Sequence, residues 1–430
     1  MFRIFYIFEK NNYMKNFLLP ALLLLSSLGF SQNFIQAYKD RANLVLQNNL
    51  QTYNADLVAK GIRHIGSTTS YNNYYNNNKG ALDYIVLKLK EFGYTDADMV
   101  IQNVGTTAKP ILNLILTKVG VDPAKVDTFV IMGGHFDSVA TGVGANDNLS
   151  GVAAIMETAR ILKTVNTNYS VKFIFFNAEE SGTYNGVSGG LYGSSKYVSS
   201  LPTNTNIRVM FNLDMVGGNS TLINNSVTCE ADKYNGTTTG IVSSNDAQSL
   251  IYTTQLQQSV ANYSNLTGFL SSAYSSDYMP FENKGYVITG FYERMTNASG
   301  TVIEPNPTYH KSSDTTANIS YPYLLQTTMA ALGAMQHFAE ADTSTTVLAA
   351  TESKDLNNFK IYPNPAKDVI NITVPFTDKY QIIVIEPSGK ILINDNSKKQ
   401  IDISKLKNGI YYVIIKTPKQ SVYETIIIEK

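Results

Sequence analysis

The sequence predicts an α/β protein in which a mixed, mostly parallel sheet is flanked by helices and is followed by a small all-β sandwich. Short apolar runs typical of buried strands, such as 128–132, 171–176 and 207–213, alternate with segments of helical periodicity such as 150–162. Strands that alternate with helices form mainly parallel sheets covered on both faces. After residue 358 the segments become short and β-like and are separated by turns, which predicts the sandwich.

The elements of the larger part are predicted from two patterns. Helices are placed where apolar residues recur at helical spacing, and strands where short apolar runs are bounded by turn residues. The segment 61–78, with its run of Tyr and Asn, is expected to be a polar loop, and His64 in it a surface or packing residue. In chain order, the expected elements are helices at 33–49 and 80–92, strands at 100–104, 111–117 and 128–132, a helix at 150–162, a strand at 171–176, a helix at 189–199, a strand at 207–213, a helix at 246–263, a strand at 286–292 and a helix at 323–339.

Composition divides the chain into four segments. Residues 1–31 combine a lysine, a short apolar run and small residues, which is the pattern of a signal peptide, and Met14 is an alternative true start. Residues 33–340 carry the alternation of strands and helices, and residues 341–358 are rich in Thr, Ser, Ala and Asn, as expected of a linker. Residues 359–430 form the predicted sandwich. We therefore expect an exported protein with one large and one small domain.

The charge and cysteine content exclude several classes of protein. The chain has 430 residues, a formal net charge of zero and 16% charged residues, so no global basic field indicates a nucleic-acid partner. The N-terminal apolar run is too short for a transmembrane helix, and no other segment is apolar enough to span a membrane. The single cysteine, Cys229, excludes an intrachain disulfide and is expected to be a buried or loop residue rather than a nucleophile.

Ionisable side chains stand at the ends of three predicted strands, and two more stand in loops. The carboxyl ends of parallel strands meet at one edge of a sheet, so these side chains are expected to lie close together. Buried neighbouring carboxylates are costly unless cations lie between them, which predicts a metal site. The alternative is a set of separate surface acids and helix caps. The residues concerned are His135, Asp137, Asp147, Glu179, Glu180, Asp214 and His310.

Five sequence blocks resemble, in order, the motifs of the M28 zinc aminopeptidases. The resemblance runs from about residue 61 to 339 and implies a mixed, mostly parallel sheet between helices. It also implies an enzyme that uses two zinc ions, with Co²⁺ or Mn²⁺ as substitutes, to release N-terminal residues, apolar ones in particular. The blocks are GGHFDS at 133–138, GANDNLSGVAA at 144–154, NAEESG at 177–182, NLDMVG at 212–217 and YHKSSDT at 309–315.

The resemblance implies a ligand set for each zinc ion. His135 and Asp214 would bind one ion, and Glu180 and His310 the other. Asp147 would bridge both ions, and the peptide bond that follows it is typically cis in the family. The sequence block around Asp147 is therefore expected to be the centre of the site.

The resemblance also implies roles for residues that do not bind metal. Glu179 would be the general base, and Asp137 would orient the ring of His135. Tyr309 is expected either to donate a hydrogen bond to the tetrahedral oxyanion or to pack as an aromatic beside a metal ligand. Asp277, in the block SSDYMPF, is expected in the wall of the cleft or at the start of a helix.

The C-terminal segment resembles the sorting domain of the type IX secretion system of Bacteroidota. The blocks that carry this resemblance are IYPNPAKDVINI at 361–372, NGIYYVIIKT at 408–417 and ETIIIEK at 424–430. The resemblance implies the type IX machinery as a partner, a secreted or outer-membrane-surface location and removal of the tail. A carbohydrate-binding or adhesion sandwich is the alternative, although the chain contains no tryptophan to form a sugar platform.

The leading hypothesis is a secreted metallo-exopeptidase that acts on peptides or proteins with free N-termini. A glutaminyl cyclase of the same fold would use one zinc and would typically replace the sequence that follows the bridging aspartate, whereas residues 148–151 keep the peptidase form. A catalytically inactive binding or adhesion protein would be expected to lack a ligand or the base. None of these residues is missing from the sequence.

Overall fold

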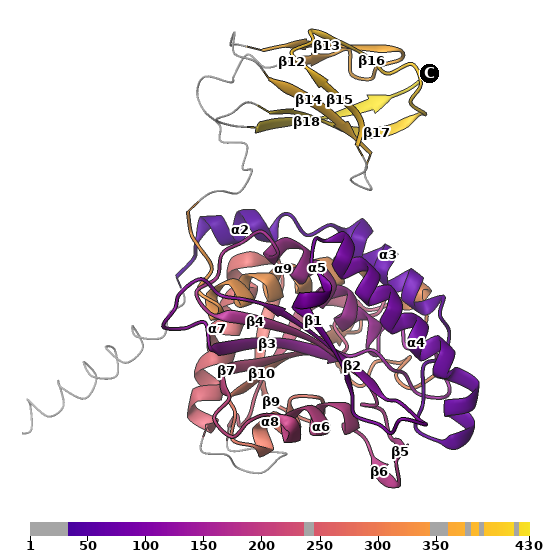
Figure 1. Cartoon of the computed structure of the whole chain (residues 1–430), viewed down its shortest axis with the longest axis vertical. Coiled ribbons are helices and arrows are strands. Elements are labelled where there is room, and N and C mark those ends of the chain that lie inside the picture. Colours follow the sequence, from indigo (N-terminus) through magenta and orange to yellow (C-terminus); the bar gives the residue numbers. More distant parts are fainter. Residues whose placement is uncertain (1–32, 236–244, 345–359, 375–379, 387–390, 417–420) are drawn as a thin grey trace, which may run out of the picture. The chain divides into compact units, whose positions relative to one another are not determined.

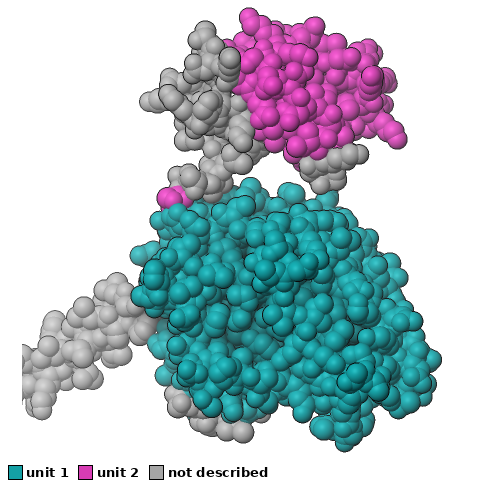
Figure 2. Space-filling model, in the orientation of Figure 1, with its two compact units in different colours: residues 1–343 teal, residues 344–430 magenta. Residues whose placement is uncertain are grey.

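The computed structural model of the chain describes residues 33–235, 245–344, 360–374, 380–386, 391–416 and 421–430. The chain divides into two compact units, residues 1–343 and 344–430, shown in teal and magenta in Figure 2. The expected signal peptide and most of the expected linker lie outside the described residues.

The larger unit is built on one mixed sheet, with the strand order β1-β2-β4-β3-β7-β10-β8-β9 and with β11 paired to β10. Strands β4, β3, β7 and β10 run parallel to their neighbours in this central part, and antiparallel pairs flank them. This confirms the expected fold class. The strands are β1 (Met99–Asn103), β2 (Leu112–Lys118), β3 (Thr128–His135), β4 (Ser170–Phe176), β7 (Asn206–Leu213), β8 (Ile223–Ala231), β9 (Thr267–Ser272), β10 (Ile288–Thr296) and β11 (Val302–Ile303).

The central strands are apolar throughout because both faces of the sheet are covered. In β3, Val130 and Met132 belong to the core on one face, and Ile131 belongs to the core on the opposite face. This alternation follows from the two-residue period of a strand. Full burial of an aliphatic side chain of this size contributes about 1.5–3 kcal/mol, so a continuous apolar run stabilises a strand in the centre of the sheet.

Helices cover both faces of the sheet, in unequal numbers (Figure 1). Helices α6 (Tyr192–Ser200) and α8 (Met279–Asn283) pack on the face that includes Ile131. A short hairpin of β5 (Gly182–Tyr184) and β6 (Val187–Gly189) and the 3₁₀ turns η1 (Asp96–Asp98) and η2 (Thr316–Asn318) complete the unit. The opposite, larger core includes residues of α2 (Gln36–Ala42), α3 (Gln47–Val58), α4 (Thr68–Glu91), α5 (Leu149–Leu162), α7 (Asp246–Tyr263) and α9 (Tyr321–Phe338).

The expected polar loop at 61–78 is wrong for most of its length, because α4 begins at Thr68. The side chain of Ser67 accepts a hydrogen bond from the backbone N–H of Ser70 and caps the helix. The rings of Tyr71 and Tyr75, one turn apart, stack with their centroids 4.8 Å apart. These local contacts and the packing of the helix outweigh the low helix propensity of its asparagines.

The smaller unit forms two antiparallel sheets with the strand orders β12-β13-β16 and β15-β14-β17-β18. Both sheets contribute to one apolar core, so the expectation of an all-β unit is confirmed. The strands are β12 (Lys360–Tyr362), β13 (Val369–Thr373), β14 (Gln381–Ile385), β15 (Ile391–Asn396), β16 (Gln400–Asp402), β17 (Gly409–Lys416) and β18 (Ser421–Ile428).

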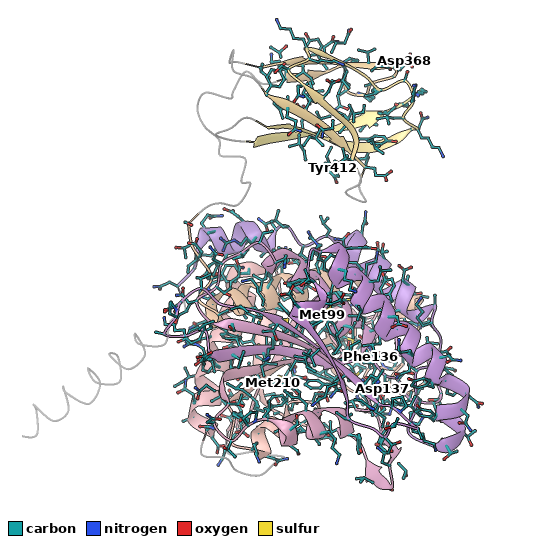
Figure 3. All side chains as sticks on the ribbon, in the orientation of Figure 1. Met99, Phe136, Asp137, Met210, Asp368 and Tyr412 are labelled. Atoms are coloured by element: carbon teal, nitrogen blue, oxygen red, sulfur yellow. The ribbon has the colours of Figure 1, made fainter. Side chains whose placement is uncertain are left out.

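Two further features concern the described residues as a whole. None of the helices in this part of the chain combines the length and the apolar character needed to cross a bilayer. Cys229 lies on β8 and is fully buried, as expected for a structural cysteine. Figure 3 shows Met210 in the sheet and Phe136 and Asp137 just beyond the end of β3, where the polar side chains gather.

Candidate metal centre

Three neighbouring strands of the sheet end at the same edge and deliver polar side chains there. His135 is the last residue of β3, Asp214 directly follows β7, and Glu179 follows the end of β4. Asp147 comes from the loop that leads into α5, and His310 from the loop between β11 and η2. These residues therefore lie together at one edge of the sheet, as expected from the sequence.

The side chains of the centre form two groups around one carboxylate. Nε2 of His135 lies 3.3 Å from Oδ1 of Asp147 and 3.6 Å from Oδ1 of Asp214. Nε2 of His310 lies 3.3 Å from Oδ2 of Asp147 and 3.3 Å from Oε2 of Glu180. The two oxygens of Asp147 therefore face two different sets of ligand atoms.

These distances fit divalent metal ions. Around a tetrahedral zinc ion with bonds of 2.0–2.1 Å, neighbouring ligand atoms lie about 3.3–3.4 Å apart, close to the separations in both groups. Oε1 of Glu180 and Oδ1 of Asp214 are buried and have no hydrogen-bond partner among the described residues. Imidazole nitrogens and carboxylate oxygens are ligands that zinc favours, and each group offers three of them. The residues present therefore suit two ions.

The electrostatics of the centre also favour bound cations. Burial raises the pKa of Glu179 well above its ordinary value and raises that of Glu180 to about 7. Burial alone would lower the pKa of His310, but Asp147 and Glu180 raise it to about 10. Burial likewise opposes protonation of His135, yet the charge of Glu179 and the surrounding aspartates raise its pKa. The site carries an excess of negative charge, which divalent cations would neutralise.

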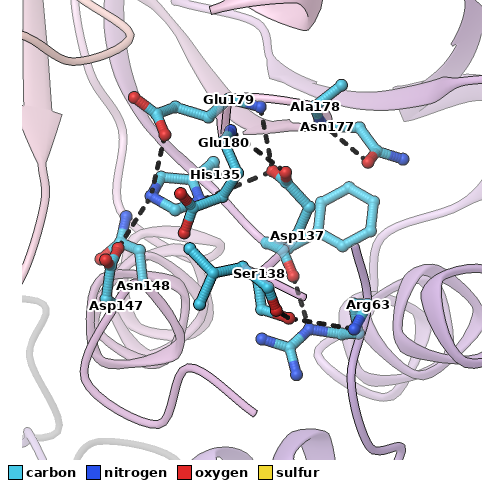
Figure 4. A network of polar contacts seen from close by, with 12 residues as sticks. Arg63, His135, Asp137, Ser138, Asp147, Asn148, Asn177, Ala178, Glu179 and Glu180 are labelled. Atoms are coloured by element: carbon cyan, nitrogen blue, oxygen red, sulfur yellow. Dashed lines mark hydrogen bonds and ion pairs between the residues drawn. The ribbon is translucent and has the colours of Figure 1, made fainter. Parts of the chain in front are cut away.

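Asp137 connects the end of β3 to the segment that follows β4 (Figure 4). Its Oδ1 lies 3.5 Å from Nδ1 of His135, on the side of the ring away from the other carboxylates. The same carboxylate accepts the backbone N–H groups of Glu179, at 3.1 Å, and Glu180, at 3.2 Å. Asp137 is fully buried and so lies where it can orient the imidazole and hold the two glutamates.

Asp314 and Asn148 hold the loop of Asp147 from both sides. The carboxylate of Asp314 accepts the backbone N–H groups of Asn146, at 2.8 Å, and Asp147, at 3.0 Å. Oδ1 of Asn148 accepts the N–H groups of Gly151, at the start of α5, and Met215, after β7. The peptide bond between Asp147 and Asn148 is cis, as expected.

A buried carboxylate on β10 joins three loops of the site. Glu293 accepts the side-chain amide of Asn146 on both oxygens at 2.9 Å and that of Asn306 at 2.9 Å. It also accepts the backbone N–H of Gly218 at 2.8 Å. Sequence reasoning missed this residue, although an ionisable side chain within a buried strand was a signal. It missed Asp314 too, which stands within the YHKSSDT block.

Arg63 is another buried residue that sequence reasoning did not assign. Its Nε donates to the carbonyl of Phe136 at 2.6 Å, and its Nη1 donates to the carbonyl of Val143 at 2.8 Å, so it supports both ends of the loop after β3. Figure 4 shows it beneath the metal-binding side chains. The neighbouring His64 contacts the carbonyl of Ser181 through Nε2 and belongs to none of the candidate metal groups.

Several backbone positions at the centre adopt the left-handed conformation that non-glycine residues avoid. These are Ala178, with φ +58°, Met215, with φ +52°, and His310, with φ +56°. Ala178 precedes Glu179, and Met215 follows Asp214. Such conformations cost about 1–3 kcal/mol each and tend to cluster at functional sites, where the surrounding contacts enforce them.

The centre opens onto a cavity of about 650 Å³. Tyr309 lines it, and its ring stacks on that of His310 with the centroids 3.7 Å apart. This geometry leaves both expected roles of Tyr309 open. Ser276 and Tyr278, the neighbours of Asp277, line the cavity, so the SSDYMPF block forms part of the cleft wall, whereas Asp277 itself is fully buried and is not among the lining residues. It stands two residues before α8, whose N-cap is Tyr278 with no side-chain cap hydrogen bond, so Asp277 does not cap this helix either.

Comparisons with known proteins agree with this geometry. Residues 113–335 match the sequence model of Peptidase family M28, and residues 360–429 match that of the Secretion system C-terminal sorting domain. The chain is 34% identical over 143 residues to Leupeptin-inactivating enzyme 1 of Streptomyces exfoliatus. The aligned stretch covers 32% of this chain and 30% of the relative. The chain is 47% identical over 85 residues to Aminopeptidase YwaD of Bacillus subtilis, which covers 19% of this chain and 17% of the relative. The matches thus span less than a third of either relative.

Solved structures share the fold at low sequence identity. The LapA aminopeptidase of Legionella pneumophila superposes with a TM-score of 0.54 at 17% identity and covers 72% of this chain and 75% of its own. A glutaminyl cyclase of Bacteroides thetaiotaomicron superposes with a TM-score of 0.51 at 18% identity and covers 67% of this chain and 97% of its own. At these identities the similarity establishes the fold, and the reaction has to be inferred from the residues of the site.

Proposed function

The chain belongs to peptidase family M28, and on that premise we propose that it is a secreted zinc aminopeptidase that removes N-terminal residues from peptides. The observation that carries this proposal is the placement of Asp147 between two ligand sets, with each of its oxygens 3.3 Å from a different imidazole. A carboxylate in that position is suited to bridge two metal ions.

The ligand set follows from the two groups. His135 and Asp214 would hold one zinc ion, Glu180 and His310 the other, and Asp147 both, with Co²⁺ or Mn²⁺ as substitutes. When bound, such a pair of ions polarises the scissile carbonyl and lowers the pKa of water. The chain itself fixes the ligands: the hydroxyl of Ser276 donates to Oδ2 of Asp214 at 2.5 Å and leaves Oδ1 facing His135.

Glu179 is the proposed general base. It lines the cavity, and its Oε2 lies 3.8 Å from Nε2 of His135, so the carboxylate borders the candidate metal-binding groups. In the proposed reaction it accepts a proton from the attacking water and returns it to the leaving amine. The hydrogen bond from its backbone N–H to Asp137 fixes its position relative to His135.

Tyr309 is the proposed donor to the developing oxyanion. Burial and the neighbouring carboxylates raise the pKa of its hydroxyl, so the group keeps its proton at neutral pH and remains a donor. Its stacking on His310 holds the ring at the metal centre. The competing interpretation is that this ring only packs against the ligand.

The C-terminal unit supports the proposed location. A sorting domain indicates delivery by a secretion system, and we propose the type IX machinery as the partner and the medium or the outer-membrane surface as the destination. The substrates would then be extracellular peptides or proteins with free N-termini. The expected leader at 1–31 lies outside the described residues and stays a prediction.

The alternatives have less support from the site. A glutaminyl cyclase with a single zinc ion would require only one of the two ligand sets around Asp147. A catalytically inactive binding protein would not require Glu179 to be held beside the ligands. Both the second ligand set and the candidate base are assembled.

The decisive experiment compares aminoacyl anilides with the same compounds blocked at the amine. We expect the zinc-loaded full chain to cleave the free series only, and Glu179→Ala to lose turnover by at least about a thousandfold while it retains bound zinc. Glu91→Ala, a surface substitution on α4, is the matched control. Cleavage of blocked substrates would overturn the exopeptidase assignment, and an active Glu179→Ala enzyme would exclude Glu179 as the base.

A further inference from the structure

The cavity that the proposed metal ligands line carries two further carboxylates. Glu230, next to the end of β8, and Glu304, after β11, both line the cavity. Both also line a second hollow of about 540 Å³, and the two hollows share Tyr274 and Tyr292 as well. These four side chains therefore form a common wall that continues the site away from the metal ligands.

Glu230 is built into this wall. It is 6% exposed, and its Oε2 accepts the hydroxyl of Tyr278 at 2.9 Å. Gly290 stands opposite Glu230 on β10, where a Cβ would lie 3.0 Å from both Oε2 of Glu230 and the ring of Tyr278. The glycine thus leaves the space that this carboxylate and its hydrogen-bond partner occupy.

The two carboxylates of this wall are not paired with a basic side chain in the described part of the chain. No ion pair joins Glu230 or Glu304 to a basic residue among the described residues, and no Lys or Arg lines the larger cavity. Arg294 lines only the second hollow, where its guanidinium lies over the ring of Phe269 at 4.3 Å. A buried carboxylate is costly unless it is paired, so the natural complement is a cation brought by a ligand.

The remaining lining suits a long side chain with a charged end. Leu191, Met215 and Pro305 offer apolar contact within the cavity. Tyr292, which is half-buried, offers an aromatic face of the kind that guanidinium groups pack against. A purely aliphatic side chain would fill the apolar part and leave both carboxylates without a cationic partner.

We infer that this wall is the pocket for the side chain of the first substrate residue and that it selects a cationic one, arginine or lysine, through Glu230 and Glu304. The inference rests on the proposed aminopeptidase function and names its substrate class. It differs from the apolar preference that the sequence resemblance implied. Burial raises the pKa of Glu230 to about 8 despite the hydrogen bond from Tyr278, and an adjacent guanidinium would lower it.

The test compares arginine with its neutral isostere. We would measure kcat/KM of the full-length, zinc-loaded protein for the 4-nitroanilides of arginine, citrulline and leucine. Wild-type protein should prefer arginine to citrulline by at least about tenfold, because a hydrogen bond to a charged group in a buried site supplies that much discrimination. Glu230→Gln should lower the arginine-to-citrulline ratio by about 10- to 100-fold and leave the leucine rate within about threefold.

Two further variants make the test independent of folding. Glu304 is exposed, so Glu304→Gln should fold normally, and it should lower the same ratio by about three- to tenfold. Glu91→Gln, the same chemical change on the surface of α4, should leave the ratio unchanged. The cationic pocket would be refuted by a wild-type arginine-to-citrulline ratio near one. It would also be refuted if both cavity variants lost kcat/KM equally for all three substrates. In either case, cleavage of the leucine anilide would still support the aminopeptidase function. Failure of wild-type protein to cleave any of the three would refute the proposed function and this inference with it.

Discussion

Asp314 offers a sharp test of how the chain holds the proposed metal-bridging loop around Asp147, because Asp314 itself is not a proposed ligand. Its carboxylate accepts the backbone N–H groups of Asn146 and Asp147 at 2.8 and 3.0 Å. A hydrogen bond to a charged group contributes about 1.5–3 kcal/mol, so the pair contributes about 3–6 kcal/mol before water replaces any of it. In Asp314→Ala both donors remain buried without an acceptor, and the loop of Asp147 loses its support on this side. We expect the free energy of unfolding to fall by about 2–4 kcal/mol.

The metal affinity of the same variant is the more specific measurement. Loss of a residue that positions a ligand typically weakens metal binding by about 10- to 100-fold. We expect a comparable decrease in the zinc affinity of Asp314→Ala, measured by competition with a chromogenic chelator. Asp83→Ala is the matched control, because Asp83 is an exposed aspartate on α4 whose ion-pair partner is Lys79. Unchanged zinc affinity in a folded Asp314→Ala protein would refute the claim that this carboxylate positions Asp147.

Three other predictions follow from the described contacts. Tyr309→Phe should lower kcat by about 10- to 100-fold with zinc content unchanged if the hydroxyl donates to the oxyanion, and an unchanged kcat would leave only the packing role. Removal of zinc by a chelator should lower the thermal midpoint by roughly 10–15 °C, because each of the two proposed ions contributes about 4 kcal/mol when it is bound at a thousandfold excess over Kd; a calorimetric scan without any shift would contradict the ligand set. Burial lowers the pKa of His337 to about 4, so the folded state binds fewer protons than the unfolded chain between about pH 4 and 6.5. Stability should therefore decrease by about 2–3 kcal/mol as pH falls through that window, and His337→Gln, which keeps an acceptor for Tyr263, should flatten the dependence in urea titrations at each pH.

The central sheet was predictable because burial on both faces leaves a simple pattern. The runs at 128–132, 171–176 and 207–213 are apolar throughout, and each lies within a strand of the structure. Strand β8 was not predicted, because its sequence INNSVTCEA mixes polar and apolar residues. Its polar side chains have reasons that a single sequence does not display: Glu230, for example, faces a cavity formed with distant segments.

The metal centre was more predictable than the residues that support it. His135, Asp147 and the other ligands stand in short blocks at strand ends, so their types and positions carry the signal. Asp314, Glu293 and Arg63 act through hydrogen bonds to backbone groups from segments up to 168 residues away. Such partnerships depend on the folded path of the chain, and nothing in the local sequence specifies them.

The most direct test of the account is anomalous diffraction at the zinc edge from crystals of the full-length protein grown with zinc. The account predicts two peaks per chain, each about 2.0–2.2 Å from a different oxygen of Asp147. One peak should also contact His135 and Asp214, and the other Glu180 and His310. A single peak, or two peaks of which one does not contact Asp147, would contradict the claim that this aspartate joins two metal sites.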